Sequence, residues 1–344
     1  MSNKRKKVIL KNTSKYEVLK LAKGVDLGQY LHYSANYNVE NNYKYISDWV
    51  YTDDGRVYFK SGESVVYGDT QRLRVVNELL YDNLAMQLGM WTAKYEPATL
   101  KDTSSLISHD VLEFADMNEE LRTIGNYFNV PFRQEIGLDR ILEKWDSIPQ
   151  LQGYKCDKED LVFKIYRMMV LDAITFQEDR HEDNIHLFVD DKNKTVRFAP
   201  IIDNEYAFAA KTLNKFFEVS EYGNLEYIID EDEFLAQHGA ALRLTVRNDT
   251  QYLPSPEKYK KNAMDLVKFA STKPRLKAFL FDALKCVDIN QAIESIERKG
   301  YAISDDYKQY LKDLTKLSKK IFAECIKEYK ETNEQAKREG DCKE

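Results

Sequence analysis

Two stretches of the chain decide its fold: residues 161–184 read LVFKIYRMMVLDAITFQEDRHEDN, and residues 195–205 read TVRFAPIIDNE. In the first stretch, apolar residues recur at helical spacing over 161–176, which predicts a helix with one buried face. A polar and largely acidic segment, 177–184, follows that helix. The second stretch is a β-like run that ends at Asp203. The predicted order is therefore a buried helix, an acidic loop and then an acidic residue at a strand end.

The polar residues of these stretches match what phosphoryl transfer requires. The reaction needs a carboxylate that orients the attacking hydroxyl, and oxygen ligands that hold Mg²⁺ against the nucleotide phosphates. In protein kinases a catalytic Asp and a metal-binding Asn stand five positions apart, and a second metal-binding Asp follows a short hairpin. Asp179 and Asn184 have this spacing, and Asp203 has the place of the second Asp. The pattern favours a kinase that uses ATP and Mg²⁺.

The chain before residue 115 is predicted to be rich in strands. Segments 43–51 and 56–60 contain many Tyr, Val, Ile and Phe residues, and they flank an Asp-Gly pair that is a strong hairpin signal. Leucines then recur at helical spacing from Leu73 to Leu88, with a glycine next in line to cap the helix. A further strand is expected over 106–112.

Two residues of this strand-rich part complete the kinase pattern. Kinase chemistry needs a Lys on a strand to contact phosphates and a Glu on the following helix to pair with it. Lys60 and Glu78 have these places. Each residue alone is ordinary, because a strand-terminal Lys is usually solvated and Glu is a good helix former. The prediction depends on the order of all five polar residues along the chain.

Beyond residue 115 the predicted elements are mainly helical. One small hairpin interrupts them, with strands at 185–189 and 195–202 on either side of a polar turn. The charged tail from Thr332 to Glu344 is expected to fray. Apolar residues recur at helical spacing over segments 134–145, 159–176, 258–270, 275–286 and about 305–332.

This change in pattern predicts an α+β fold of two lobes. A small strand-rich lobe over residues 1–114 would carry the ATP-binding Lys and one helix. A larger, mainly helical lobe over residues 115–344 would carry the catalytic loop and the metal-binding Asp. ATP and Mg²⁺ are then expected in the cleft between the lobes.

The chain resembles the HipA-like serine/threonine kinases of bacteria, which share a protein-kinase-like fold with the phosphoinositide kinases. The similarity covers about residues 55–210. The blocks that match, in order, are Phe59-Lys60, Asn77-Glu78 with Leu84-Ala85 and Leu88-Gly89, Ile107-Ser108, Asp179-Arg180-His181-x-x-Asn184, and Ala199-Pro200-Ile201-Ile202-Asp203.

The resemblance implies Asp179 as the catalytic base, with Asn184 and Asp203 as Mg²⁺ ligands. It implies transfer of the γ-phosphoryl group of ATP to a Ser or Thr hydroxyl of a protein substrate, with autophosphorylation as a further activity. Its setting would be a bacterial toxin or effector, and an antitoxin or other regulatory protein is the expected partner. Arg180 and His181 are expected to stabilise the catalytic loop.

The resemblance also implies which residues hold ATP. Lys60 would contact the phosphates and Glu78 would support it, while a hinge near His109 and Val111 would lie beside the adenine. One departure concerns the phosphate-binding loop, expected near residues 34–42, which contains no glycine to permit close backbone approach. A catalytically silent, kinase-like binding module is therefore one alternative. A phosphoinositide-type lipid kinase is another.

Composition excludes several other classes of protein. The 344 residues are 43% hydrophobic and 12% aromatic, which is typical of a folded chain. The net charge of −6 gives no basic field for nucleic acid, and no helix-turn-helix signature is recognisable. Four widely spaced cysteines fit neither a disulfide framework nor a zinc site. With neither a signal peptide nor a membrane span recognisable, a cytoplasmic location is expected.

Overall fold

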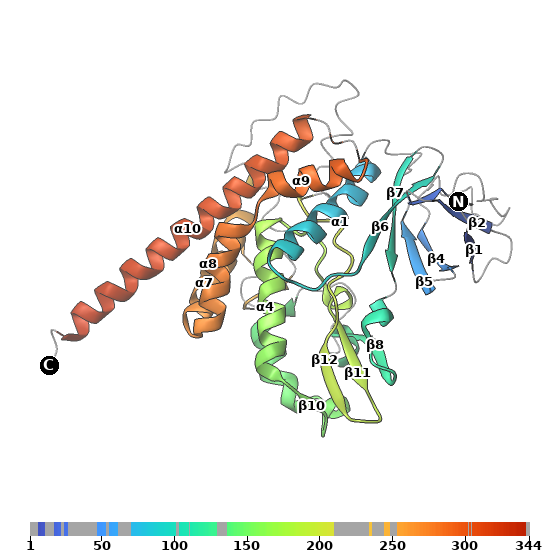
Figure 1. Ribbon diagram of the computed structural model, residues 1–344. Helices are drawn as coiled ribbons and strands as arrows, with labels where there is room; N and C mark the ends of the chain where they lie inside the picture. The colour runs from blue at the N-terminus through green and yellow to red at the C-terminus, as the bar shows by residue number, and fades with distance from the viewer. Residues whose placement is uncertain are drawn as a thin grey trace.

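The computed structural model shows a mixed α+β fold. It describes residues 6–10, 17–21, 24–26, 47–52, 55–60, 70–100, 103–109, 111–128, 136–209, 234–235, 244–247, 253–301, 303 and 305–341. The barrel strands lie on the right in Figure 1, and most helices lie on the left, with helix α1 between them. The predicted phosphate-binding loop at 34–42 lies outside the described residues, and the division into two lobes at residue 114 stays a prediction.

The N-terminal strands form a closed barrel in the order β1-β2-β3-β6-β7-β5-β4. Their bounds are β1 (Lys6–Leu10), β2 (Glu17–Leu21), β3 (Gly24–Asp26), β4 (Ser47–Thr52), β5 (Gly55–Lys60), β6 (Tyr95–Leu100) and β7 (Thr103–His109). The predicted hairpin is confirmed, because β4 and β5 pair antiparallel with Thr52 opposite Gly55. The strand expected over 106–112 ends earlier, at His109, and a 3₁₀ helix (Val111–Phe114) follows.

Helix α1 (Thr70–Gln87) is the predicted leucine helix. Leu79, Leu80 and Leu84 are completely buried, so the apolar residues at helical spacing form the buried face of this helix. Its end is the predicted glycine cap. Gly89 has φ +58°, and the amides of Gly89 and Met90 donate to the carbonyls of Met86 and Ala85.

The hairpin predicted among the helices belongs to a second sheet, with described strands in the order β10-β12-β11-β8. They are β8 (Glu119–Thr123), β10 (Lys155–Cys156), β11 (His186–Asp190) and β12 (Thr195–Phe198). Asp190 closes the turn by accepting hydrogen bonds from the amides of Lys192 and Asn193. The second hairpin strand was predicted to reach 202, but β12 ends at Phe198, because beyond it only an isolated bridge joins Ile201 to Thr92.

The helical part is built around α4, which is buried along most of its length. Helix α10 continues to Asp341, so the prediction of a frayed tail after 332 is wrong for residues up to 341. Helix α9, which the sequence patterns did not predict, packs along α1. The described helices of this part are α2 (Gly125–Phe128), α3 (Leu138–Lys144), α4 (Lys158–Ile174), α7 (Ser255–Ser271), α8 (Pro274–Cys286), α9 (Ile289–Arg298) and α10 (Asp305–Asp341).

Within the described residues, no helix is long and apolar enough to cross a membrane. Cys156, Cys286 and Cys325 are free thiols.

A buried hydrogen-bond chain joins the first and last long helices. Asn77 of α1 is completely buried, and its Nδ2 donates to the carbonyl of Ala207 at 3.0 Å. The hydroxyl of Tyr307, on α10, donates to Asn77 Oδ1. Burial raises the pKa of Tyr307, so this hydroxyl stays protonated at neutral pH. The chain thus connects α1, the segment after Asp203 and α10 through one amide side chain.

We expect Tyr307→Phe to destabilise the fold by about 1 to 3 kcal/mol, because Asn77 Oδ1 would lose this donor in a dry environment. Urea denaturation followed by circular dichroism measures the change. Tyr329→Phe, at a half-buried tyrosine of the same helix, is the matched control. Equal effects of the two variants would contradict the prediction.

Candidate active site

The predicted catalytic loop follows α4 and is held by its own hydrogen bonds. Asn184 Nδ2 donates to the carbonyl of Asp179 at 2.8 Å, and the amide of His181 donates to the same carbonyl at 2.8 Å. His181 Nδ1 then accepts from the amide of Asp183, which caps the 3₁₀ helix Glu182–Asn184. Asp179 and Asn184 are both buried. The five-residue spacing therefore folds into a compact turn that brings these two predicted site residues together.

Arg180 is the centre of the loop. Only 1% of its side chain is exposed, and it donates to both carboxylate oxygens of Asp172 at 3.0 and 3.1 Å. It also donates to the Ile202 carbonyl at 2.8 Å and to Asn204 Oδ1 at 2.5 Å. Burial lowers the pKa of Arg180, but Asp172, Tyr81 and Asp203 together raise it above its ordinary value, so the guanidinium stays charged. Arg180 therefore positions the segment around Asp203, and the expected structural role agrees with this geometry.

Glu78 connects α1 to the Asp203 segment. Its carboxylate is completely buried, and Oε1 accepts from the amide of Asn204 at 2.9 Å and from the hydroxyl of Tyr95 at 2.5 Å. Asp203 itself has φ +59°, a left-handed conformation that costs a non-glycine residue about 1 kcal/mol or more. The surrounding bonds from Arg180 and Glu78 hold this conformation.

Three carboxylates gather where α1 meets this segment. Oxygen atoms of Glu78, Asp203 and Glu205 lie within 4.8 Å of one another. Arg74 lies 3.7 Å from Glu205 and offsets part of the negative charge. Carboxylate oxygens are the ligands that Mg²⁺ prefers, so the donor chemistry around Asp203 fits that ion.

The pKa values of two neighbouring side chains, Tyr206 and His186, are shifted by burial and by nearby charges. Burial raises the pKa of Tyr206 to about 12; Arg74 lowers it, and the charges of Glu205, Asp179 and Asp203 raise it. The charges of Asp179 and Asp203 therefore both reach the Tyr206 hydroxyl. Burial lowers the pKa of His186 to about 4, so this imidazole is neutral at pH 7.

The residues expected to contact ATP lie on the barrel side. Lys60 is the last residue of β5, in register with Leu106 of β7. His109 ends β7, and its amide donates to the carbonyl of Lys94 at 2.8 Å. Val111 follows as a buried residue of the 3₁₀ helix. The predicted hinge therefore coincides with the end of a strand.

Sequence patterns missed three residues that build this site. Asp172 lies in the apolar run of α4, and a lone carboxylate on a buried helix face was a usable signal for a charged partner. Glu205 stands two residues after Asp203, and the acidic pair was visible as well. Tyr95 gave no signal, because its bond to Glu78 depends on how β6 packs against α1.

No family model matches the sequence, and no curated protein matches it. Among solved structures, the chain is similar to a Helicobacter pylori proinflammatory kinase, CtkA, with 13% identity and a TM-score of 0.44 over 83% of this chain and 96% of that one. It is also similar to a chain in a Shewanella oneidensis complex of the toxin–antitoxin system HipA and HipB with operator DNA, with 11% identity and a TM-score of 0.48. That match covers 79% of this chain and 58% of the other. Both similarities are distant, and the family resemblance stays a prediction.

Asp172→Asn is expected to destabilise the fold by about 3 to 5 kcal/mol, because the buried guanidinium of Arg180 would lose its anionic partner. The substitution keeps the shape of the side chain and an acceptor for the Tyr81 hydroxyl. Guanidinium chloride denaturation measures the loss. Asp305→Asn, at a carboxylate whose side chain is 97% exposed, should change stability by less than about 0.5 kcal/mol.

The protonation state of Asp82, on helix α1, makes the stability of the fold depend on pH. Burial raises its pKa to about 6, the hydrogen bond from Thr92 and the charge of Lys299 lower it, and Glu78 raises it. The pKa of Asp82 in the folded state lies above its value in the unfolded chain. The contribution of protonated Asp82 to the free energy of unfolding is therefore fully present below about pH 4 and is lost as pH rises through about 6.

We therefore expect Asp82→Asn to be more stable than the wild type at pH 7, and the difference between them to shrink as pH falls toward 4. Thermal unfolding of both proteins between pH 4 and 8 measures it. A difference that does not change with pH would show that Asp82 titrates normally.

Proposed function

We propose that the chain is a kinase that uses ATP and Mg²⁺ to transfer the γ-phosphoryl group to a Ser or Thr hydroxyl of a protein substrate. One observation carries the proposal: buried Arg180 joins the loop of Asp179 and Asn184 to the segment of Asp203. This contact supports the proposal, because it ties the loop of Asp179 and Asn184 to the residues on either side of Asp203, and phosphoryl transfer needs such groups close together.

Each polar residue has a distinct role in this proposal. Asp179 accepts the proton of the substrate hydroxyl as that oxygen bonds to the γ-phosphorus, while the bond from phosphorus to the β–γ bridging oxygen breaks and ADP leaves. Asn184 and Asp203 would hold Mg²⁺, which neutralises charge on the phosphates. The buried, prearranged loop means that little reorganisation is needed when the substrate binds.

The ATP-binding side of the proposal rests on the barrel. Lys60 would contact the phosphates, Glu78 would support it, and His109 and Val111 would lie beside the adenine. The strand-rich lobe over 1–114 and the helical lobe over 115–344 would then enclose the nucleotide. Because Glu78 already bonds to the amide of Asn204, a shift of α1 would also shift the metal-binding segment. ATP binding and metal binding would therefore be coupled through Glu78.

The protein should transfer label from γ-³²P-ATP to itself or to a generic basic protein in the presence of Mg²⁺. Asp179→Asn and Asp203→Asn are expected to reduce the rate by about 10²-fold or more, because each removes a charge that acts on the reacting groups. Asp305→Asn, which removes an exposed charge on α10, should label like the wild type. Circular dichroism checks that each variant is folded.

Other outcomes distinguish the remaining functions. Label on phosphoinositide vesicles, with none on protein, would identify a lipid kinase. No transfer to protein or lipid, together with no ATP binding by calorimetry, would contradict the proposal and favour a kinase-like binding module. Transfer that survives in Asp179→Asn would show that another residue accepts the proton.

A further inference from the structure

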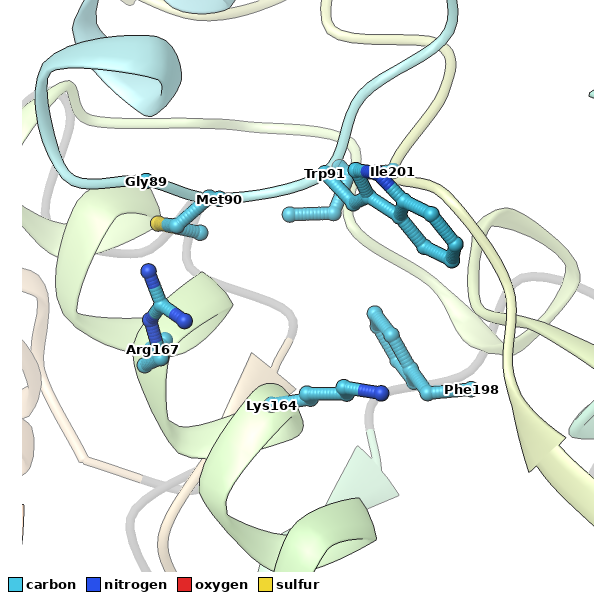
Figure 2. A pocket seen from close by; sticks show the side chains of 7 residues that line it. All are labelled: Gly89, Met90, Trp91, Lys164, Arg167, Phe198 and Ile201. Carbon is cyan, nitrogen blue, oxygen red and sulfur yellow. The ribbon is translucent and has the colours of Figure 1, made fainter. Parts of the chain in front are cut away.

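A cavity of about 300 Å³ lies where the end of α1 meets α4 and β12 (Figure 2). It contains none of the residues proposed to act on ATP or Mg²⁺. Such a volume falls within the range of small-molecule sites and exceeds the roughly 150 Å³ that accommodates benzene in a protein core. The residues that line it are Gly89, Met90, Trp91, Lys164, Arg167, Phe198 and Ile201.

One part of this cavity is apolar and aromatic. Phe198, Ile201 and Met90 are buried, whereas Trp91 is 49% exposed. In Figure 2 the rings of Trp91 and Phe198 lie on the same side of the cavity. Trp91 is fixed in place by Phe114, whose ring centroid lies 5.6 Å away. The half-exposed Trp91 and the buried Phe198 therefore provide two aromatic surfaces against which a planar apolar group of a ligand can pack.

The other part of the cavity is cationic. Lys164 and Arg167 stand three residues apart on α4, and so occupy the same face of the helix. Figure 2 shows both side chains reaching toward the open space, Lys164 toward Phe198 and Arg167 toward Met90. Arg167 donates to the carbonyl of Leu88, but its Nε atom is buried without a hydrogen-bond partner within the described part of the chain.

Nearby carboxylates balance only part of the positive charge here. Lys164 lies 2.7 Å from Asp160, and Arg275 lies 3.9 Å from the same residue. Arg167 has no carboxylate partner among the described residues, and it lies over the rings of Phe163 and Phe279 instead. Burial lowers the pKa of Arg167, the charge of Arg275 lowers it further, and the charge of Asp160 raises it. The two cations that line the cavity, Lys164 and Arg167, therefore share one nearby carboxylate, which leaves an excess of positive charge there.

We propose that this cavity binds a small organic anion with an aromatic body. The carboxylate or phosphate of the ligand lies against Lys164 and Arg167, and its ring lies against Trp91 and Phe198. An anion would supply the negatively charged partner that Arg167 lacks among the described residues. The aromatic surfaces would remove the ring of the ligand from water. This inference does not depend on the proposed kinase activity, because no residue of the cavity takes part in that reaction.

Three probes of one shape test the proposal by isothermal titration calorimetry. We expect 1-naphthyl phosphate or 1-naphthoate, or both, to bind with one molecule per chain. The neutral analogue 1-naphthylmethanol should bind at least about tenfold more weakly, which is the loss expected when a charge-assisted hydrogen bond is absent. Binding of the phosphate alone, or of the carboxylate alone, would identify the anionic group that the site selects.

Two variants locate the binding site. Lys164→Gln should weaken the anions about tenfold and leave the neutral alcohol unchanged, because it removes a charge only. Trp91→Ala should weaken all three probes. The matched control is Lys327→Gln, since Lys327 also forms a helical ion pair four residues from a carboxylate but lies on α10 away from the cavity.

Three results would overturn the proposal. The first is no detectable binding of either anion to the folded wild type. The second is equal affinity for the neutral and charged probes. The third is anion binding that Lys164→Gln leaves unchanged, since this would place the anion elsewhere on the chain, for example in the candidate active site.

Discussion

The buried ion pair between Arg180 and Asp172 is the constraint on which the rest of the candidate site depends. A guanidinium that is 1% exposed is tolerated only if its charge and its N–H groups are satisfied, because an unpaired buried charge costs several kcal/mol. Asp172 meets the charge, while the Ile202 carbonyl and Asn204 Oδ1 meet remaining donors. The hydrogen bonds that the buried Arg180 guanidinium requires therefore fix the end of α4, the loop after it and the segment around Asp203 relative to one another.

Glu78 extends this constraint to α1. Its carboxylate accepts from the backbone of Asn204, so the helix cannot move without exposing a buried acceptor or breaking that bond. The left-handed backbone of Asp203 is the local cost of the arrangement, and it lies between the bonds that Arg180 makes to Ile202 and Asn204. Strain of this kind persists only where the surrounding contacts over-determine it. The position of the proposed metal ligand is thus a consequence of packing in two separate helices.

The sequence allowed prediction of those elements whose signals are local. Helices α1 and α4 and the β11–β12 hairpin have clear apolar periods and turn residues. Strand β8 reads EELRT and becomes a strand only by pairing with β11, so no local pattern identified it. Helix α10 reaches Asp341 because Glu, Lys, Gln and Ala are good helix formers even without burial, so a polar sequence does not by itself end a helix. In the site, Asp179 and Asn184 were predictable from spacing, whereas Tyr95 depends on tertiary packing.

Helix α4 connects the cationic cavity to the acidic loop that follows the helix. Its middle turns present Lys164 and Arg167 to an aromatic cavity, and its end leads into the acidic loop of Asp179. A short segment connects the two: the amide of Ile201 donates to the carbonyl of Trp91 at 2.8 Å, and Ile201 stands two residues before Asp203. An anion at the cavity would contact Trp91, which is bonded to the segment that leads to Asp203, the proposed metal ligand. Such a ligand could affect the candidate active site only by displacing the segment around Asp203. The buried hydrogen bonds of Arg180 and Glu78 oppose this displacement, because they would have to break.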